Sequence, residues 1–219
     1  MKLYQTYRCS ACGNETEVQK VGGGTLSCCG QPMELTTKNL TLVNLLKAFA
    51  GESQARNKYD YFAKVANKEG YRDIAGHFER AAKNEKSHAK LELALHNRML
   101  TASDNSFGDT AHNLQEAIEG ERYEHQSMYP EFAEIAKEEG HDEAARLFKA
   151  IGKIEVEHEM MYSSLLKRLQ ANQEFESDNE TEEWICEVCG HVHRGKKAIK
   201  LCPVCKHPQA FMSRLNTRK

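Results

Sequence analysis

The long central segment of the chain has the polar and apolar pattern of helices, and the two terminal segments do not. Residues 40–172 contain a single proline, Pro130, and long stretches of good helix formers. Glu-Gly pairs ending at Gly70 and Gly140 fit the glycine cap that ends many helices. The pattern therefore predicts four helices, at about residues 40–68, 72–100, 111–138 and 142–170.

The connections between these helices are short, long and short, because a polar crossover at 101–110 separates the two pairs. That order is typical of a four-helix bundle with one crossover connection. The terminal segments are rich in cysteine and glycine, which favours short strands and loops. The stretch before the last segment is acidic and weakly apolar, as in a flexible linker. We predict a mainly α chain with these parts: a small domain at 1–37, a bundle at 38–172, a linker at 173–183 and a small domain at 184–219.

The helical segment contains an internal repeat. When the sequence is shifted by 70 residues, Gly70 falls on Gly140 and Phe78 falls on Phe148. The first helical hairpin is therefore echoed by the second. A two-fold arrangement of such hairpins would place equivalent side chains face to face, as a two-metal centre requires.

The repeat carries a Glu-x-x-His motif in each hairpin, formed by Glu85 with His88 and by Glu155 with His158. Three residues make nearly one helical turn, so both side chains project from the same helix face. A carboxylate can bridge two hard metal ions while an imidazole caps one of them. A lone motif of this kind is most often two solvent-facing side chains, whereas its recurrence at matching repeat positions favours a metal site.

Two further acids occupy matching positions upstream, Glu52 in the first helix and Glu121 in the third, each directly after a glycine. One Glu from each of two helices and Glu-x-x-His from each of the other two is the pattern of di-iron and di-manganese bundles. An apolar stripe that includes Phe49 and Phe78 precedes the acids of the first hairpin. Burying acids there is costly without cations to pair them, which again favours a metal centre.

The repeat is interrupted by one extra residue in the third helix. Glu121 precedes its matching phenylalanine by eleven residues, whereas Glu52 precedes its counterpart by ten. Single insertions in helices are commonly absorbed as a π-bulge, often at a functional site. We predict that Glu124, one turn past Glu121, is an additional ligand presented by this distortion. In the alternative, Pro130 alone perturbs the helix and Glu124 faces water.

All eight cysteines lie in the terminal segments, in two groups of four: Cys9, Cys12, Cys28 and Cys29, and Cys186, Cys189, Cys202 and Cys205. The chain shows neither a signal peptide nor an apolar run long enough to span a membrane, so we expect a cytoplasmic protein. Paired cysteines in that reducing compartment more often hold metal than form disulfides. Four thiolates suit zinc or a single iron, and the spacing of the C-terminal group does not choose between them. In the N-terminal group the adjacent Cys28 and Cys29 would force a distorted angle at the metal, which is unusual for a structural zinc ribbon.

The charge is distributed unevenly along the chain. Residues 184–219 carry a net charge of +7 and residues 40–183 carry −10. A basic tail is typical of nucleic-acid binding. Because an acidic partner of matching size lies on the same chain, we favour docking of the tail onto the bundle, and we expect no nucleic-acid partner.

Three sets of residues resemble known families. The run Trp184-Ile-Cys-Glu-Val-Cys-Gly with the later Cys-Pro-Val-Cys resembles rubredoxin, with the central loop shortened as in rubrerythrins. The Cys28-Cys29 pair with the following Gly-Gln-Pro-Met resembles desulforedoxin. Phe49-Ala-Gly-Glu-Ser-Gln-Ala-Arg and Met128-Tyr-Pro resemble the rubrerythrin family. The combination is similar to the desulforubrerythrins, which implies a ferritin-like four-helix bundle flanked by two small metal-binding domains.

The resemblance also implies the cofactor, a di-iron oxo centre with one further iron in each four-cysteine site. In such proteins Glu85 and Glu155 would bridge the two irons, and His88 and Glu124 would alternate as ligands of one of them. Two tyrosines would hydrogen-bond the carboxylates. The implied catalytic residues are Glu52, Glu85, His88, Glu121, Glu124, Glu155, His158, Tyr59 and Tyr129.

The activity that the resemblance implies is reduction of hydrogen peroxide to water. Electrons would come from an external NAD(P)H-dependent reductase or another donor, and pass singly through the four-cysteine irons. We expect a homodimer or tetramer formed by domain swapping, without a membrane partner. One alternative is a ferritin-like ferroxidase that handles iron. Another is a zinc scaffold whose basic tail binds nucleic acid.

Overall fold

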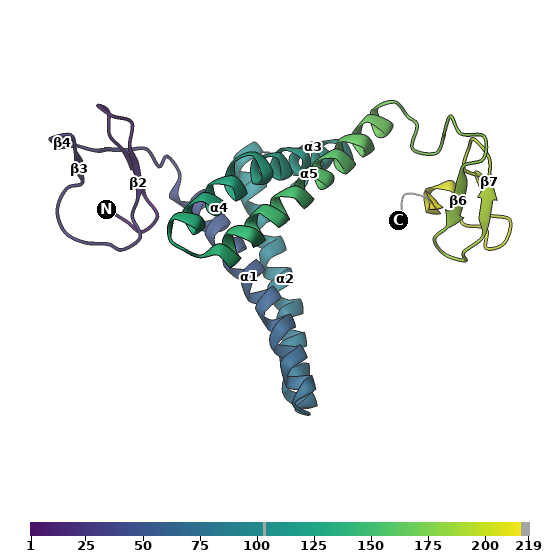
Figure 1. Cartoon of the computed structure of the whole chain (residues 1–219), viewed down its shortest axis with the longest axis horizontal. Helices are drawn as coiled ribbons and strands as arrows, with labels where there is room; N and C mark the ends of the chain where they lie inside the picture. The colour runs from purple at the N-terminus through teal and green to yellow at the C-terminus, as the bar shows by residue number, and fades with distance from the viewer. Residues whose placement is uncertain (103, 216–219) are drawn as a thin grey trace. The chain divides into compact units, whose positions relative to one another are not determined.

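The computed structural model describes residues 1–102 and 104–215, and it divides into two compact units, Met1–Phe107 and Gly108–Lys219 (Figure 1). The first unit opens with a small module of two antiparallel sheets. In one sheet, β1 (Thr6–Arg8) pairs with both β2 (Glu15–Glu17) and β5 (Glu34–Leu35). In the other, β3 (Ser27–Cys28) pairs with β4 (Gln31–Pro32). Short strands and loops are what the sequence predicted here.

A helical hairpin completes the first unit, formed by α1 (Leu40–Lys68) and α2 (Arg72–Thr101). The side chain of Asn39 accepts hydrogen bonds from the first free backbone N–H groups of α1, which defines the start of that helix. Gly70 allows the reversal because its φ of +88° lies in the left-handed region. Ala63, Ala66 and Ala75 are buried between the two helices, so small side chains set their close approach.

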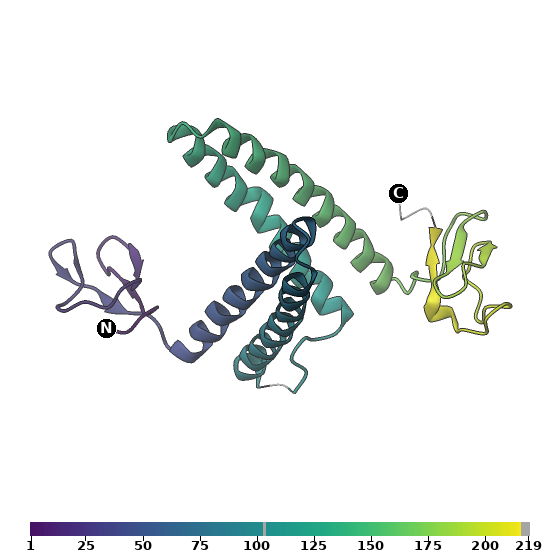
Figure 2. The ribbon, with the colours of Figure 1, turned by 90° about the horizontal axis from the view of Figure 1, so that it is seen from below.

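The second unit repeats this plan with one difference. Its hairpin consists of α3 (Thr110–Tyr123), the π-helix η1 (Glu124–Met128), α4 (Tyr129–Glu138) and α5 (Asp142–Gln170). The paired helices of this hairpin are visible in Figure 2. The four predicted helices are confirmed, with ends within one residue of expectation. The π-helix is confirmed at the insertion, whereas α1 runs unbroken through the matching stretch. The prediction of a mainly α chain is correct.

The C-terminal module of the second unit is a three-stranded antiparallel sheet with the order β7-β6-β8. Its strands are β6 (Glu183–Cys186), β7 (Val192–Arg194) and β8 (Met212–Arg214), and the 3-10 helix η2 (Gln209–Phe211) precedes the last strand. Trp184 is fully buried and packs with Ala198 and Met212. The module therefore has an apolar core of its own beside the cysteines.

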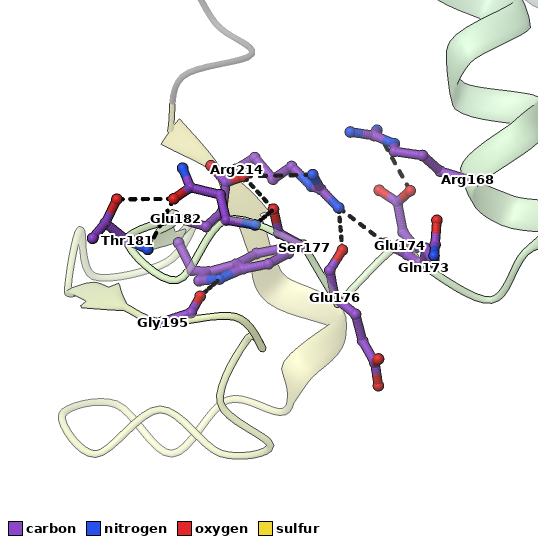
Figure 3. Close-up of polar contacts among 11 residues, drawn as sticks. Arg168, Gln173, Glu174, Glu176, Ser177, Thr181, Glu182, Gly195 and Arg214 are labelled. Carbon is purple, nitrogen blue, oxygen red and sulfur yellow. Dashed lines mark hydrogen bonds and ion pairs between the residues drawn. The ribbon is translucent and has the colours of Figure 1, made fainter.

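The stretch expected to be a flexible linker is folded against this module. Phe175 packs on the module core, and its carbonyl accepts the Ala198 N–H at 2.9 Å. The Arg214 guanidinium lies over the Trp184 ring, 5.1 Å from its centroid, and pairs with Glu182 at 3.5 Å. The same guanidinium donates to the carbonyls of Gln173 and Glu176 (Figure 3). One phenylalanine and one arginine thus supply contacts to the module that the acidic composition of this segment hides, and its flexibility stays a prediction.

None of the helices in the described residues combines the length and the apolarity that a membrane span requires.

Candidate metal centres

Each helical hairpin gathers three of the predicted ligands within its own unit. In the first hairpin, one ligand atom each from Glu52, Glu85 and His88 lie within 4.8 Å of one another. His88 Nδ1 is 2.8 Å from Glu85 Oε2 and 3.8 Å from Glu52 Oε2. The set offers two carboxylates and one imidazole on facing sides of α1 and α2, which suits a divalent metal ion.

The second hairpin repeats this geometry. Glu121, Glu155 and His158 also bring their ligand atoms within 4.8 Å of one another. His158 Nδ1 lies 2.6 Å from Glu155 Oε2 and 3.7 Å from Glu121 Oε2. The sequence repeat is therefore a repeat of side-chain geometry as well, and it supplies two matching sets of metal ligands.

The electrostatics of both sets favour a bound cation. The pKa of Glu52 is raised, first by its hydrogen bond with Glu85 and then by burial. Burial raises the pKa of Glu121, and the nearby charge of Glu155 adds to this. Glu155 is only 8% exposed, so its charge is poorly hydrated. Crowded, buried carboxylates are costly when ionised, and a cation between them removes that cost. The residues present therefore fit a metal centre.

Sequence reasoning missed one acid beside the first set. Glu92 lies two turns after Glu85 on α2, and its charge contributes to the raised pKa of Glu52. Its Oε2 atom is shielded from solvent and has no hydrogen-bond partner among the described residues. The repeat places Tyr162 at the matching position of the second hairpin. The signal for Glu92 was present in its spacing from Glu85 along one helix face.

Glu124 is the first residue of the π-helix and lies outside the cluster of three in its hairpin. Its charge nevertheless raises the pKa of Glu121. Burial raises the pKa of Tyr129, and the charge of Glu124 is the next cause. Glu124 is therefore close enough to act on the second set, although it is not part of that set in this arrangement.

The two tyrosines pack against phenylalanines in equivalent ways. The ring centroid of Tyr59 is 6.0 Å from that of Phe78, and the centroid of Tyr129 is 6.2 Å from that of Phe148. Neither hydroxyl donates a hydrogen bond to a carboxylate within its own unit, as far as the described residues extend. The hydrogen bonds implied for these tyrosines are therefore not formed inside either hairpin.

The C-terminal cysteines form a compact four-sulfur group whose ligand atoms lie within 4.8 Å of one another. Cys186 Sγ is 3.5 Å from Cys205 Sγ, and Cys189 Sγ is 3.6 Å from Cys202 Sγ. Sulfurs at tetrahedral corners with metal–sulfur bonds of about 2.3 Å lie roughly 3.8 Å apart, so the spacing fits a metal ion. Backbone N–H groups of Cys205 and Val204 lower the pKa of Cys202 to about 6, because they stabilise its thiolate.

The N-terminal cysteines form a second such group, again with ligand atoms within 4.8 Å. Cys12 Sγ is 3.6 Å from Cys28 Sγ, which in turn is 3.8 Å from Cys29 Sγ. The adjacent pair is possible because Cys29 adopts a left-handed φ of 52°. The backbone N–H of Cys12, with that of Ala11, lowers the pKa of Cys9 to about 6. All eight cysteines are free of disulfides, so both groups can bind metal.

Three family profiles match the chain in succession. The rubrerythrin profile covers residues 44–166, more than half of the chain. The N-terminal domain of desulfoferrodoxin matches residues 2–36. The rubredoxin-like domain of rubrerythrin matches residues 184–212. The order agrees with the three resemblances found in the sequence.

Relatives of this kind occur in several bacteria. The chain is 49% identical to a rubrerythrin of Porphyromonas gingivalis over 179 residues, which are 80% of this chain and 89% of the relative. It is 43% identical to rubrerythrin-1 of Clostridium acetobutylicum, over 80% of this chain and 94% of the relative. A rubrerythrin of Nitratidesulfovibrio vulgaris is 40% identical over 78% of this chain and 92% of its own length.

These matches also decide between the metals that the ligand sets allowed. The cofactor is iron, in a di-iron site of the rubrerythrin domain and in the rubredoxin-like and desulforedoxin-like four-cysteine sites. The match to the rubrerythrin family therefore favours iron over the zinc scaffold considered from the sequence. With its helical hairpins, its paired carboxylate and histidine sets and its two four-cysteine modules, the chain belongs to the rubrerythrin family.

Proposed function

We propose that this protein is a non-haem di-iron peroxidase that protects the cell from hydrogen peroxide. The overall reaction consumes one hydrogen peroxide, two protons and two electrons and yields two water molecules. The observation that carries the proposal is the presence, on one chain, of two matched carboxylate and histidine sets together with two four-thiolate sites. The first kind of site suits two-electron chemistry at paired irons, and the second kind carries single electrons.

The proposed ligands have different roles at the iron pair. Glu85 and Glu155 would be the ligands shared by the two metals, while Glu52 and Glu121, with the histidines, would complete the ligand set of each. When bound there, iron would supply the two electrons that reduction of the O–O bond requires. The carboxylates compensate the metal charge, and Tyr129, with its raised pKa, keeps its proton and serves as a hydrogen-bond donor. Glu124 would be the seventh ligand.

Assembly of the complete centre brings both hairpins together. Each hairpin leaves large apolar side chains exposed: Leu91 is 68% exposed on α2, and Met160 is 62% exposed on α5. Exposed apolar side chains of this size favour association. We propose a homodimer or tetramer in which hairpins are exchanged between chains.

Electrons reach the di-iron centre through the rubredoxin-like iron. An external NAD(P)H-dependent reductase, or another donor, refills that iron. The net charge of +7 on residues 184–219 supports docking onto an acidic surface, whether of the donor or of the helical part of a partner chain. Free thiolates of this kind persist in a reducing compartment, which supports a cytoplasmic location. We also propose three domains, at 1–37, 38–172 and 184–219, because each of these segments carries one kind of metal site.

Anaerobic stopped-flow absorption on the fully reduced protein tests the proposal. We expect oxidation of the di-iron centre by peroxide to be at least about tenfold faster than oxidation by dioxygen. Cys189→Ser should leave this single turnover intact and abolish steady-state turnover with a reductase. Fast oxidation by dioxygen with sluggish oxidation by peroxide would contradict the proposal and favour a ferritin-like ferroxidase, which uses the same bundle ligands.

A further inference from the structure

The second hairpin contains a polar cluster that the proposed chemistry does not use. Glu159 on α5 accepts hydrogen bonds from Arg122 on α3, from Nε at 2.9 Å and from the terminal nitrogen at 2.7 Å. Its other oxygen lies 2.5 Å from His125 Nε2 in the π-helix. One carboxylate therefore binds two elements of the hairpin at once. We call these three residues the Glu159 brace.

Each member of the brace directly follows a proposed ligand in the sequence. Arg122 follows Glu121, and His125 follows Glu124. Two of its members are well shielded, because the side chains of Glu159 and His125 are 18% and 14% exposed, whereas the Arg122 side chain is 47% exposed. Hydrogen bonds to a charged carboxylate in such surroundings are stronger than those at an open surface. The brace therefore fixes the backbone on both sides of Glu124 relative to α5.

The first hairpin provides an internal comparison, because it lacks both the brace and the π-helix. The residue that matches Glu159 is Ala89, which is buried. The residues that match Arg122 and His125 are Ser53 and Arg56. Helix α1 stays α-helical through this stretch. The brace and the π-helix thus occur together in one hairpin and are absent together from the other, within the part of the chain that the structure describes.

The brace lies at the start of a conformation that helices rarely adopt. The wider turn of the π-helix is bonded here from the Tyr129 N–H to the Glu124 carbonyl, and the conformation is rare because the α-helix competes with it. We propose that Glu159 is a positioning residue: by holding Arg122 and His125 it maintains the π-helix and directs the Glu124 carboxylate toward the Glu121, Glu155 and His158 set. This inference rests on the proposed role of Glu124 as a ligand.

Three variants of the full-length protein test the proposal. Glu159→Ala gives the second hairpin the residue of the first, and Glu159→Gln keeps an oxygen that can accept from Arg122. Glu157→Ala is the matched control, since Glu157 is an exposed glutamate on the same helix. The first measurement is amide exchange of Tyr129 by NMR in the metal-free protein. We expect Glu159→Ala to accelerate exchange about tenfold or more, and Glu157→Ala to leave it unchanged.

The second measurement is Mössbauer spectroscopy of the proteins loaded with iron-57. We expect Glu159→Ala to alter one of the two di-iron subspectra in the same way as Glu124→Ala, and Glu159→Gln to retain the wild-type spectrum. A general loss of stability would not reproduce the signature of a missing Glu124.

Wild-type exchange and a wild-type spectrum in Glu159→Ala would overturn the inference. So would a changed spectrum in that variant that Glu124→Ala does not share. If the wild-type protein bound no coupled iron pair, the proposed function would fail, whereas amide exchange at Tyr129 would still decide whether the brace maintains the π-helix.

Discussion

The two cysteine modules offer the same four ligands but obtain their folds in different ways. In the C-terminal module the cysteines surround an apolar core that includes Trp184, which is fully buried. In the N-terminal module Cys9 and Val18 are the buried residues among those described, and no apolar cluster forms around them. The number of ligands is therefore a poor guide to how strongly a module depends on its metal.

The modules also differ in how many cysteine sulfurs accept hydrogen bonds from backbone N–H groups. In the C-terminal module each Cys-x-x-Cys turn, which we call a knuckle, directs backbone N–H groups at the sulfur of its first cysteine. This lowers the pKa of both Cys186 and Cys202. In the N-terminal module a single knuckle does so, and it lowers the pKa of Cys9. The opposite pair there, Cys28 and Cys29, has raised pKa values because neighbouring thiols crowd them, with Cys12 the largest cause. The C-terminal module also contains two thiols with raised pKa values, Cys189 and Cys205, so the modules differ in that two thiolates are favoured at the C-terminal site and one at the N-terminal site.

Metal removal should give the largest difference between the modules. Structural metal binding contributes on the order of 10 kcal/mol to the folding of small domains, and the N-terminal module has little else to hold it. After chelation under reducing conditions, we expect residues 1–36 to lose amide protection completely while the C-terminal module keeps part of its own. Fluorescence of Trp184, the single tryptophan of the chain, should stay blue-shifted. Equal loss of protection in both modules would contradict this comparison.

Arg214→Ala should make the C-terminal module more like the N-terminal one. The variant removes the stacking on Trp184, leaves the Glu182 carboxylate without its cation and releases the carbonyls of residues 173 and 176. We expect a loss of about 2–3 kcal/mol in the stability of this module, from the cation–π contact and the shielded ion pair together. Chemical denaturation followed by Trp184 fluorescence measures it.

The control for that variant is Arg194→Ala. Arg194 pairs with Glu183 at 2.7 Å, but its side chain is 75% exposed. Exposed pairs contribute about 0.5 kcal/mol or less. Protease cleavage at 173–183 should increase in Arg214→Ala and not in Arg194→Ala. Equal effects of the two variants would show that Arg214 does not anchor this segment.

Local patterns could be predicted from the sequence, whereas contacts between residues far apart in the chain could not. Helical periodicity, glycine stops and the spacing of ligands are local, so the helices, the π-helix at the insertion and the three-ligand sets followed from the chain itself. The Glu159 brace and the packing of Phe175 depend on partners 34 and 23 residues away, respectively. Such contacts leave no periodic signal. For that reason an acidic segment that is anchored by two residues resembled a flexible linker.

Reduction potentials should separate the modules less strongly. Hydrogen bonds to sulfur and nearby positive charge both favour the reduced, more negative four-thiolate site. The C-terminal module has two donating knuckles and a net charge of +7, whereas residues 1–39 carry only +1. We expect the C-terminal iron to have the higher potential, by on the order of 50 mV. Spectropotentiometry of Cys9→Ser and Cys202→Ser variants, each with one module disabled, assigns the two values. A higher potential at the N-terminal iron would contradict the argument.

Acid should release metal from the two modules at slightly different pH. A thiol whose pKa is lowered in the folded chain stays ionised to lower pH, so its contribution is present above the ordinary thiol pKa and is lost as the pH falls through the lowered value. Cys186 and Cys202 have this property in the C-terminal module, where the pKa of Cys202 is about 6, and Cys9 alone has it in the N-terminal module. Each module also has two thiols with raised pKa values, so the difference between them rests on one additional favoured thiolate in the C-terminal module, and cadmium bound to the N-terminal module should dissociate at the higher pH. Absorption of the cadmium–thiolate bands during acid titration of the single-module variants measures the pH at which each module releases its metal. Release at the same pH would mean that the second knuckle has no effect on metal retention.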